Sequence, residues 1–91
     1  MKEKELERVL KALANRRRLA IINILQKGKE KNVGEIADNI KLSFRATSKH
    51  LSVLMNADIL EKEQRSLQMF YSLNKNAPSV VKQLLRVLFL V

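Results

Sequence analysis

Apolar residues recur along the first half of this chain at the three- and four-residue spacing of amphipathic helices. The first run predicts a helix over residues 2–14, with one apolar face formed by Leu6, Val9, Leu10 and Leu13. A second run predicts a helix over residues 16–26, which Asn15 caps and Gly28 ends. This second segment is apolar around most of its circumference, so we expect it to be buried on most sides.

A polar connection over residues 29–32 has room for one or two strand-like residues, and two further helices follow it. Asn32 and Glu35 have the spacing of a capping box, which predicts the start of a short helix. After a turn at residues 41–42, which lacks the usual glycine, Ser43 is placed to cap the next helix. Two short helices joined by a tight turn form a helix-turn-helix.

Beyond residue 57 the pattern changes to that of strands. Residues 59–63 and 68–73 predict two strands joined by a loop over residues 64–67, which has no glycine and so indicates no particular turn type. A β-hairpin placed directly after a helix-turn-helix is a wing. Pro78 suits the first turn of a last helix, residues 78–91, whose apolar face comprises Val80, Val81, Leu84, Leu85 and Leu88.

These elements predict one winged helix-turn-helix domain, mainly α with a small β-hairpin, in the order α-α-α-α-β-β-α. No repeat or linker divides the 91 residues. We assign the helix-turn-helix to residues 33–57, the wing to residues 59–73, and dimerisation to the terminal helices at residues 1–14 and 77–91.

The composition narrows the classes of function. A formal net charge of +9 favours a polyanionic partner, which is a nucleic acid or, less often, an anionic membrane surface; many basic proteins bind neither. Cysteine is absent, so the sequence offers no disulfide, thiolate metal site or cysteine nucleophile. With two glycines and no catalytic triad or metal constellation, we expect a protein that is not an enzyme and uses no cofactor or metal.

The sequence also bears on where the protein acts. Its start, MKEKELERVL, alternates acidic and basic residues where a secretory signal needs an apolar run. The longest uninterrupted apolar run, residues 87–91, is too short to span a bilayer. We therefore expect a soluble cytoplasmic protein that does not bind membranes.

The predicted helix over residues 43–57 has two chemically different faces. Thr47, Leu51 and Leu54 fall on one side, while Arg45, Lys49 and Ser52 fall on the other with Ser48 beside them. A short helix that buries leucines and projects Arg, Lys and Ser outward suits the recognition of DNA. An ordinary amphipathic surface helix has the same pattern, so the helix alone does not decide between the two.

Three segments resemble the arsenic-repressor-like (ArsR/SmtB) winged-helix family. They are LKALANRRRLAIINIL (10–25), LSFRATSKHLSVLMNADILEKE (42–63) and FYSLN (70–74), and together the resemblance covers nearly the whole chain. The matching positions are Leu10, Ala12, Leu13, Ala14, Asn15, Arg18, Leu19, Ser43, Ser48, His50, Leu51, Leu54, Ala57 and Ile59. The resemblance implies a winged helix-turn-helix transcriptional regulator.

The chain also departs from this family. Asn32 and Gly34 stand where metal-sensing relatives have cysteines, and the last helix has none of the acidic or histidine ligands of the family's other metal site. Asp58 takes the place of the usual glycine before the first strand of the wing. The resemblance therefore implies no metal here. His50, the single histidine, is expected to make a structural hydrogen bond.

The resemblance and the helical wheel together predict the DNA-binding surface. Arg45 and Lys49 are expected to reach base edges or phosphates in the major groove. Phe44 either packs under the start of its helix or contacts a thymine methyl group. Arg65, at the expected tip of the wing, is either solvated or enters the minor groove. The full predicted set is Lys41, Ser43, Phe44, Arg45, Ser48, Lys49, Ser52, Lys62 and Arg65.

The first and last helices carry more leucine than a domain of this size can bury internally, which indicates an interface. The predicted homodimer interface comprises Leu6, Val9, Leu10, Leu13, Val81, Leu84, Leu85, Leu88 and Phe89. We expect a sequence-specific, double-stranded DNA-binding regulator, a dimeric repressor that reads a near-palindromic operator with helix 43–57 in the major groove. The alternative is a winged-helix protein–protein interaction module whose basic charge is incidental.

Overall fold

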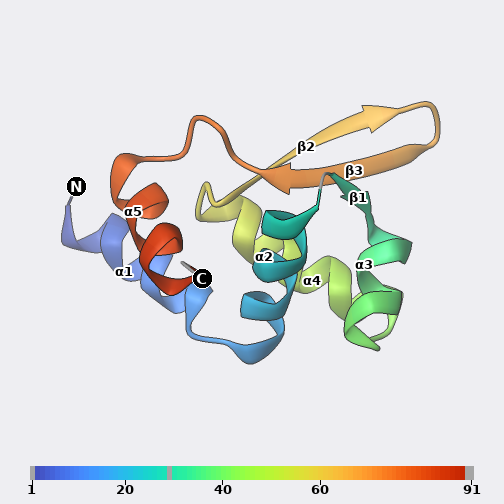
Figure 1. Cartoon of the computed structure of the whole chain (residues 1–91), viewed down its shortest axis with the longest axis horizontal. Helices are drawn as coiled ribbons and strands as arrows, with labels where there is room; N and C mark the ends of the chain where they lie inside the picture. Colours follow the sequence, from blue (N-terminus) through green and yellow to red (C-terminus); the bar gives the residue numbers. More distant parts are fainter. Residues whose placement is uncertain (1, 29, 90–91) are drawn as a thin grey trace.

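The computed structural model describes residues 2–28 and 30–89, and in these it has five helices and three strands (Figure 1). The predicted ranges that extend to Met1, Lys29, Leu90 and Val91 reach outside the described residues. In chain order the elements are α1 Glu3–Leu13, α2 Arg16–Lys27, β1 Lys31–Asn32, α3 Val33–Ile40, α4 Phe44–Asn56, β2 Leu60–Arg65, β3 Gln68–Leu73 and α5 Ser79–Leu88. The predicted order of elements is confirmed, including the strand-like residues before α3.

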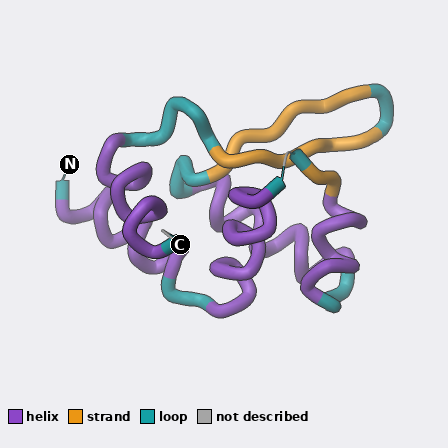
Figure 2. Tube along the Cα trace, viewed as in Figure 1, coloured by secondary structure: helices purple, strands orange, loops and turns teal. Residues whose placement is uncertain are grey.

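Helices occupy most of the molecule, and the strands form a narrow ribbon along one edge (Figure 2). The first and last helices, α1 and α5, lie at one end of the molecule, while the β2–β3 hairpin extends toward the other (Figure 1). No helix in the described part of the chain is long and apolar enough to cross a membrane.

Local side-chain caps start three of the helices where the sequence predicts them. The Asn15 carboxamide oxygen accepts the first free N–H groups of α2, from Arg17 at 2.9 Å and Arg18 at 3.1 Å. Asn32 and Glu35 form a reciprocal capping box at the start of α3, with both hydrogen bonds 2.9 Å long. The Ser43 hydroxyl accepts the Ala46 N–H at 3.1 Å and so starts α4. These caps satisfy donors that a helix cannot satisfy internally.

Three described non-glycine residues have a positive φ, and two of them, Lys41 and Asp58, lie in turns that flank α4, where glycine is the common choice. Lys41, between α3 and α4, has φ 55°, and the following Leu42 N–H returns to the carbonyl of Ala37 at 3.0 Å. Asp58, which replaces the family's usual glycine, has φ 60° after α4. The turns expected from the sequence therefore form without glycine, each at the expense of some backbone strain.

The three strands form one antiparallel sheet in the order β1-β3-β2. In the wing, Leu60 pairs with Leu73 and Arg65 pairs with Gln68, which leaves only Ser66 and Leu67 in the turn. The predicted four-residue loop over 64–67 was therefore wrong. Ser66 has φ 57°, and a positive φ at the first central residue is typical of a type II′ turn, which suits a two-residue hairpin.

All five helices and the start of the wing contribute side chains to one apolar core. Its fully buried large residues are Ile21, Ile22, Ile36, Leu51, Leu54, Ile59, Leu60 and Val81. Thr47 of α4 is also fully buried, and its hydroxyl oxygen has no hydrogen-bond partner among the described residues. Since this core holds α4 from its inner side, the outer side of the helix is left at the surface.

Candidate nucleic-acid interface

The structure gives α4 the two faces that its sequence predicts. Thr47, Leu51 and Leu54 are completely buried, whereas Arg45, Lys49 and Ser52 are exposed. Ser48 lies between the two faces and is half-buried. A rigid helix whose inner face is fixed in the core therefore presents two cations and a hydroxyl to a partner. Such groups bond phosphate oxygens and the acceptor atoms of base edges.

The turn before α4 adds further polar groups to this surface. Lys41 and Ser43 are exposed, although the Ser43 hydroxyl also caps the helix. Phe44 is 63% exposed, so its ring does not pack under the start of the helix as one of the two sequence interpretations proposed. The ring instead lines a surface groove of about 470 Å³ together with Val33, Leu67 and other residues.

Arg18 contacts the inner side of α4 and helps to fix its position, a role that the sequence alone did not predict. Its guanidinium donates to the backbone carbonyls of Ala12 at 2.7 Å and Lys11 at 3.1 Å, and lies 3.2 Å from Nδ1 of His50. One side chain thus joins α1, α2 and α4. Nothing in the local sequence distinguishes Arg18 from its neighbours, apart from its match to the family pattern.

His50 has the structural role that the sequence predicted. Its ring is half-buried on α4, and burial lowers the pKa of His50 from its ordinary value, with the positive charges of Arg18 and Arg17 acting in the same direction. The lowered pKa favours the neutral ring, whose Nδ1 can accept the hydrogen bond from Arg18.

Arg17 supports the turn of the helix-turn-helix. Its guanidinium donates to the carbonyl oxygen of Ile40, the last residue of α3, at 3.2 Å. Among the three consecutive arginines at residues 16–18, Arg18 therefore bonds to α4, Arg17 bonds to the end of α3, and Arg16 is exposed.

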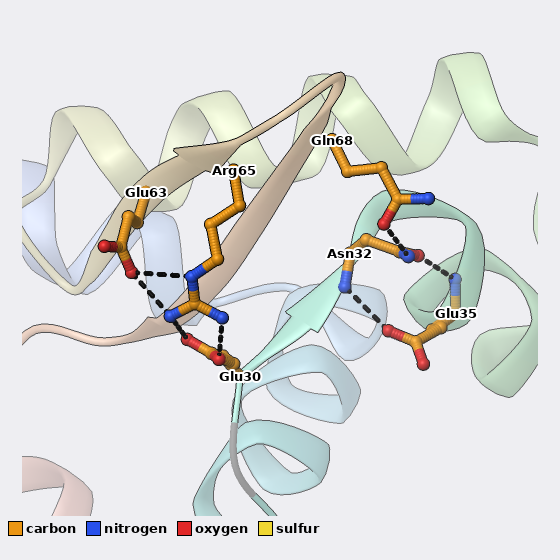
Figure 3. Close-up of polar contacts among 6 residues, drawn as sticks. All are labelled: Glu30, Asn32, Glu35, Glu63, Arg65 and Gln68. Carbon is orange, nitrogen blue, oxygen red and sulfur yellow. Dashed lines mark hydrogen bonds and ion pairs between the residues drawn. The ribbon is translucent and has the colours of Figure 1, made fainter.

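Arg65 lies beside the tip of the wing, where it pairs with Gln68 across the two-residue turn, but its side chain is held by carboxylates rather than free in solvent. Arg65 ends β2, and its side chain points away from the hairpin tip, toward Glu63 and Glu30 (Figure 3). The guanidinium donates to both carboxylates, with Nη2 2.7 Å from Glu30 Oε2 and 2.5 Å from Glu63 Oε1, and it lies 5.1 Å from the centre of the Phe70 ring. These hydrogen bonds raise the pKa of Arg65 above its ordinary value. Lys62, the other predicted wing residue, is exposed.

The terminal helices divide their apolar residues between the core and the surface. Val9, Leu13 and Val81 are buried inside the protomer, so their predicted place in a dimer interface was wrong. Leu10 is 47% exposed and Leu88 51% exposed, and Val87, which the sequence analysis did not select, is 74% exposed. Of the remaining predicted residues, Leu84, Leu85 and Phe89 are partly buried against the core, and Leu6 is partly buried.

Metal ligands are not gathered at this surface. The described residues contain no group of three or more His, Asp or Glu side chains placed to hold a metal ion. Asn32, at one of the family's cysteine positions, uses its side chain to cap α3 and to donate to Gln68 at 3.3 Å (Figure 3).

A helix-turn-helix followed by a β-hairpin and packed between terminal helices defines a winged helix-turn-helix domain. Residues 15–62 match the family model described as "Bacterial regulatory protein, arsR family". The chain belongs to the ArsR family.

Curated relatives and solved structures agree with this assignment. The chain is 33% identical to the transcriptional activator HlyU of Vibrio cholerae over 81 residues, which are 89% of this chain and 74% of that protein. It is 32% identical to the transcriptional repressor SdpR of Bacillus subtilis over 66 residues, 72% of each protein. The homodimeric winged helix-turn-helix DNA-binding domain of Mb0332 from Mycobacterium bovis superimposes with a TM-score of 0.82 at 29% identity, covering 96% of this chain and 77% of that chain.

Proposed function

We propose that the protein is a dimeric, sequence-specific regulator of transcription that inserts α4 into the major groove of double-stranded DNA. One observation carries this proposal: α4 buries Thr47, Leu51 and Leu54 completely while it exposes Arg45 and Lys49. The net charge of +9 supports a polyanionic partner. The chain belongs to a family of bacterial regulatory proteins. We therefore propose that it acts by binding rather than by catalysis, and that it acts in the cytoplasm.

The proposed roles of the contact residues follow from their chemistry. Arg45 can pair with the two acceptors of a guanine edge, and Lys49 can reach the same acceptors or a phosphate. Ser48 and Ser52 can bond either bases or phosphates, and we assign phosphate contacts to the exposed Lys41, Ser43 and Lys62. Arg65 would have to leave two carboxylates before it could bind DNA, so we assign it to positioning the wing.

We propose that two protomers associate through the apolar residues that α1 and α5 expose, chiefly Leu10, Val87 and Leu88. A shallow apolar groove of about 380 Å³ along α1, lined by Leu6, Leu10 and Ala14, continues this surface. A two-fold axis through these helices would present two copies of α4 to one side of a duplex, one helical turn apart. The operator is therefore near-palindromic.

The first experiment selects bound fragments from genomic DNA and measures the affinity for the recovered sequence at several salt concentrations. Arg45→Ala and Lys49→Ala should each weaken binding by about 1–3 kcal/mol if they make base contacts. Lys27→Ala, which removes an exposed charge at the far end of α2, is the matched control and should change affinity little. A winged-helix module that binds only proteins would recover no common sequence, and this result would refute the proposal.

The second experiment tests the dimer. Leu10→Glu together with Leu88→Glu should give folded monomers by sedimentation, because both side chains are about half exposed in the protomer. The same change at Leu67, an exposed leucine in the turn of the wing, should leave the dimer intact. An intact dimer in the double variant would reject this interface.

The relatives include an activator and a repressor. Repression requires only that the bound dimer covers DNA that RNA polymerase needs, and we propose this mode. Placing the recovered operator over the promoter of a reporter gene should give lower expression when the protein is present. Higher expression would show that the protein activates transcription instead.

A further inference from the structure

Leu67 is the most exposed large apolar side chain in the described part of the chain. It lies in the two-residue turn at the tip of the wing and is 97% exposed. The hairpin that carries it extends beyond the helices (Figure 1). A leucine in this place adds no stability to the isolated protomer, because an apolar side chain stabilises a protein only when its surface is removed from water.

The cation nearest the tip is not directed toward it. Arg65 points back along the wing and is held by Glu30 and Glu63 (Figure 3). Since residues 64, 66, 67 and 68 are Gln, Ser, Leu and Gln, the outermost part of the wing presents uncharged groups. A contact made by the tip therefore depends on apolar and neutral polar groups rather than on charge.

The tip of the wing and the start of α4 border one surface. Leu67 and Met69 line the same groove of about 470 Å³ as Phe44, the first residue of α4, and Val33, the first residue of α3. Arg45 follows Phe44 directly. The apolar tip is thus continuous with the helix surface that we propose for the major groove, and a duplex held by α4 is the partner that this continuity indicates.

We infer that Leu67 is a specificity-determining residue that the wing inserts into the minor groove beside each half-site, where it favours A·T base pairs. This inference rests on the proposed function. A guanine places an amino group on the floor of the minor groove, whereas A·T pairs leave the floor open to an apolar side chain. Leucine is among the side chains that proteins insert into minor grooves. The ion pairs of Arg65 hold the strand that positions this side chain.

The test uses the selected operator in two versions, which differ only in having A·T or G·C pairs on the outer side of each half-site. The wild-type dimer should prefer the A·T version. Leu67→Ala should weaken binding to that version by about tenfold, the order expected for removing part of a half-buried leucine, and should abolish the preference. The dependence of affinity on salt should not change, because no charge is removed.

Lys62→Ala is the matched control in the same hairpin. It should weaken binding to both versions by the same factor and reduce the salt dependence, as expected for a lost phosphate contact. Leu67 is almost fully exposed, so its substitution should leave the circular dichroism spectrum and the melting temperature unchanged.

The outcomes separate this inference from the proposed function. If Lys49→Ala weakens binding while Leu67→Ala binds both versions like the wild type, the role of Leu67 is refuted and the function of α4 stands. If Leu67→Ala instead shifts the monomer–dimer equilibrium in sedimentation, the leucine is a protein contact and the inference is again wrong. If the wild type selects no operator at all, both proposals fail.

Discussion

Replacing Arg18 by Ala should destabilise this protein strongly, although the position is partly exposed. The last turn of α1 leaves four backbone carbonyls without partners inside the helix. The N–H groups of Ala14 and Asn15 satisfy the carbonyls of Leu10 and Leu13, at 2.9 and 2.8 Å. The other two, on Lys11 and Ala12, accept from the guanidinium of Arg18, which also bonds His50.

The expected effect follows from these contacts. Hydrogen bonds that involve a charged group contribute about 1.5–3 kcal/mol each when buried, and a cation at a helix C-terminus adds about 0.3–1 kcal/mol. Arg18 is only half-buried, so water compensates for part of this loss. We expect Arg18→Ala to lower the free energy of unfolding by about 2–3 kcal/mol, which corresponds to a fall of roughly 10–20 °C in melting temperature for a domain of this size.

The assay is thermal unfolding followed by circular dichroism at one fixed protein concentration, because dimerisation makes the melting temperature depend on concentration. Arg16→Ala is the matched control, since this exposed arginine lies two positions away and makes no side-chain hydrogen bond with the described residues. Arg18→Lys keeps the charge but not the fork of donors, so it should recover less than half of the loss. Equal melting temperatures for Arg18→Ala and Arg16→Ala would refute the reasoning.

Three further changes test other features. Because the pKa of His50 is lowered in the folded state, the unfolded chain takes up a proton at this residue more readily as the pH falls through about 6.5. The free energy of unfolding should therefore decline toward acid pH. Unfolding curves between pH 7.5 and 5.5 should show a weaker decline for His50→Gln than for the wild type. Thr47→Val removes a buried hydroxyl that has no partner among the described residues and keeps the side-chain shape, so chemical denaturation should show about 1 kcal/mol of added stability; a loss would mean that the hydroxyl is bonded. Asn15→Ala removes the acceptor of two N–H groups at the start of α2 and should lower stability by about 1–2 kcal/mol, while Asn15→Asp should retain it; equal losses in the two variants would exclude the cap as the cause.

The features that local sequence predicted best are those whose causes lie within a few residues. The capping box of Asn32 and Glu35 acts over three positions, and the cap by Ser43 acts over the same distance to the N–H of Ala46. The burial of Thr47, Leu51 and Leu54 follows from helical periodicity once one face of α4 is assumed to meet a core. The order of the helices and strands and the starts of the capped helices were therefore predictable from the sequence alone.

Long-range pairing was not predictable in this way. Arg65 and Glu30 are 35 residues apart, so no local spacing could show that the arginine folds back from the tip of the wing. The apolar face of α1 is another example: Val9 enters the core while its neighbour Leu10 remains half exposed. Periodicity identifies the face, but the packing of α1 against α2 and α4 decides which of its residues are covered.

Asn32 takes part in two elements at once, and this has a mechanical consequence. Its backbone pairs with Phe70 in the sheet, its side-chain oxygen holds the first turn of α3, and its amide group donates to Gln68 beside the hairpin turn (Figure 3). A tilt of the hairpin would therefore act on the first helix of the helix-turn-helix through Asn32, together with the pairing of Lys31 with Tyr71 and the ion pair of Arg65 with Glu30. If the wing contacts DNA as we propose, bending or twisting of the duplex should therefore reach α3 through these contacts, and α4 through the packing of α3 against it. The protein would then respond to the shape of the flanking DNA and to the base sequence of the half-site at the same time.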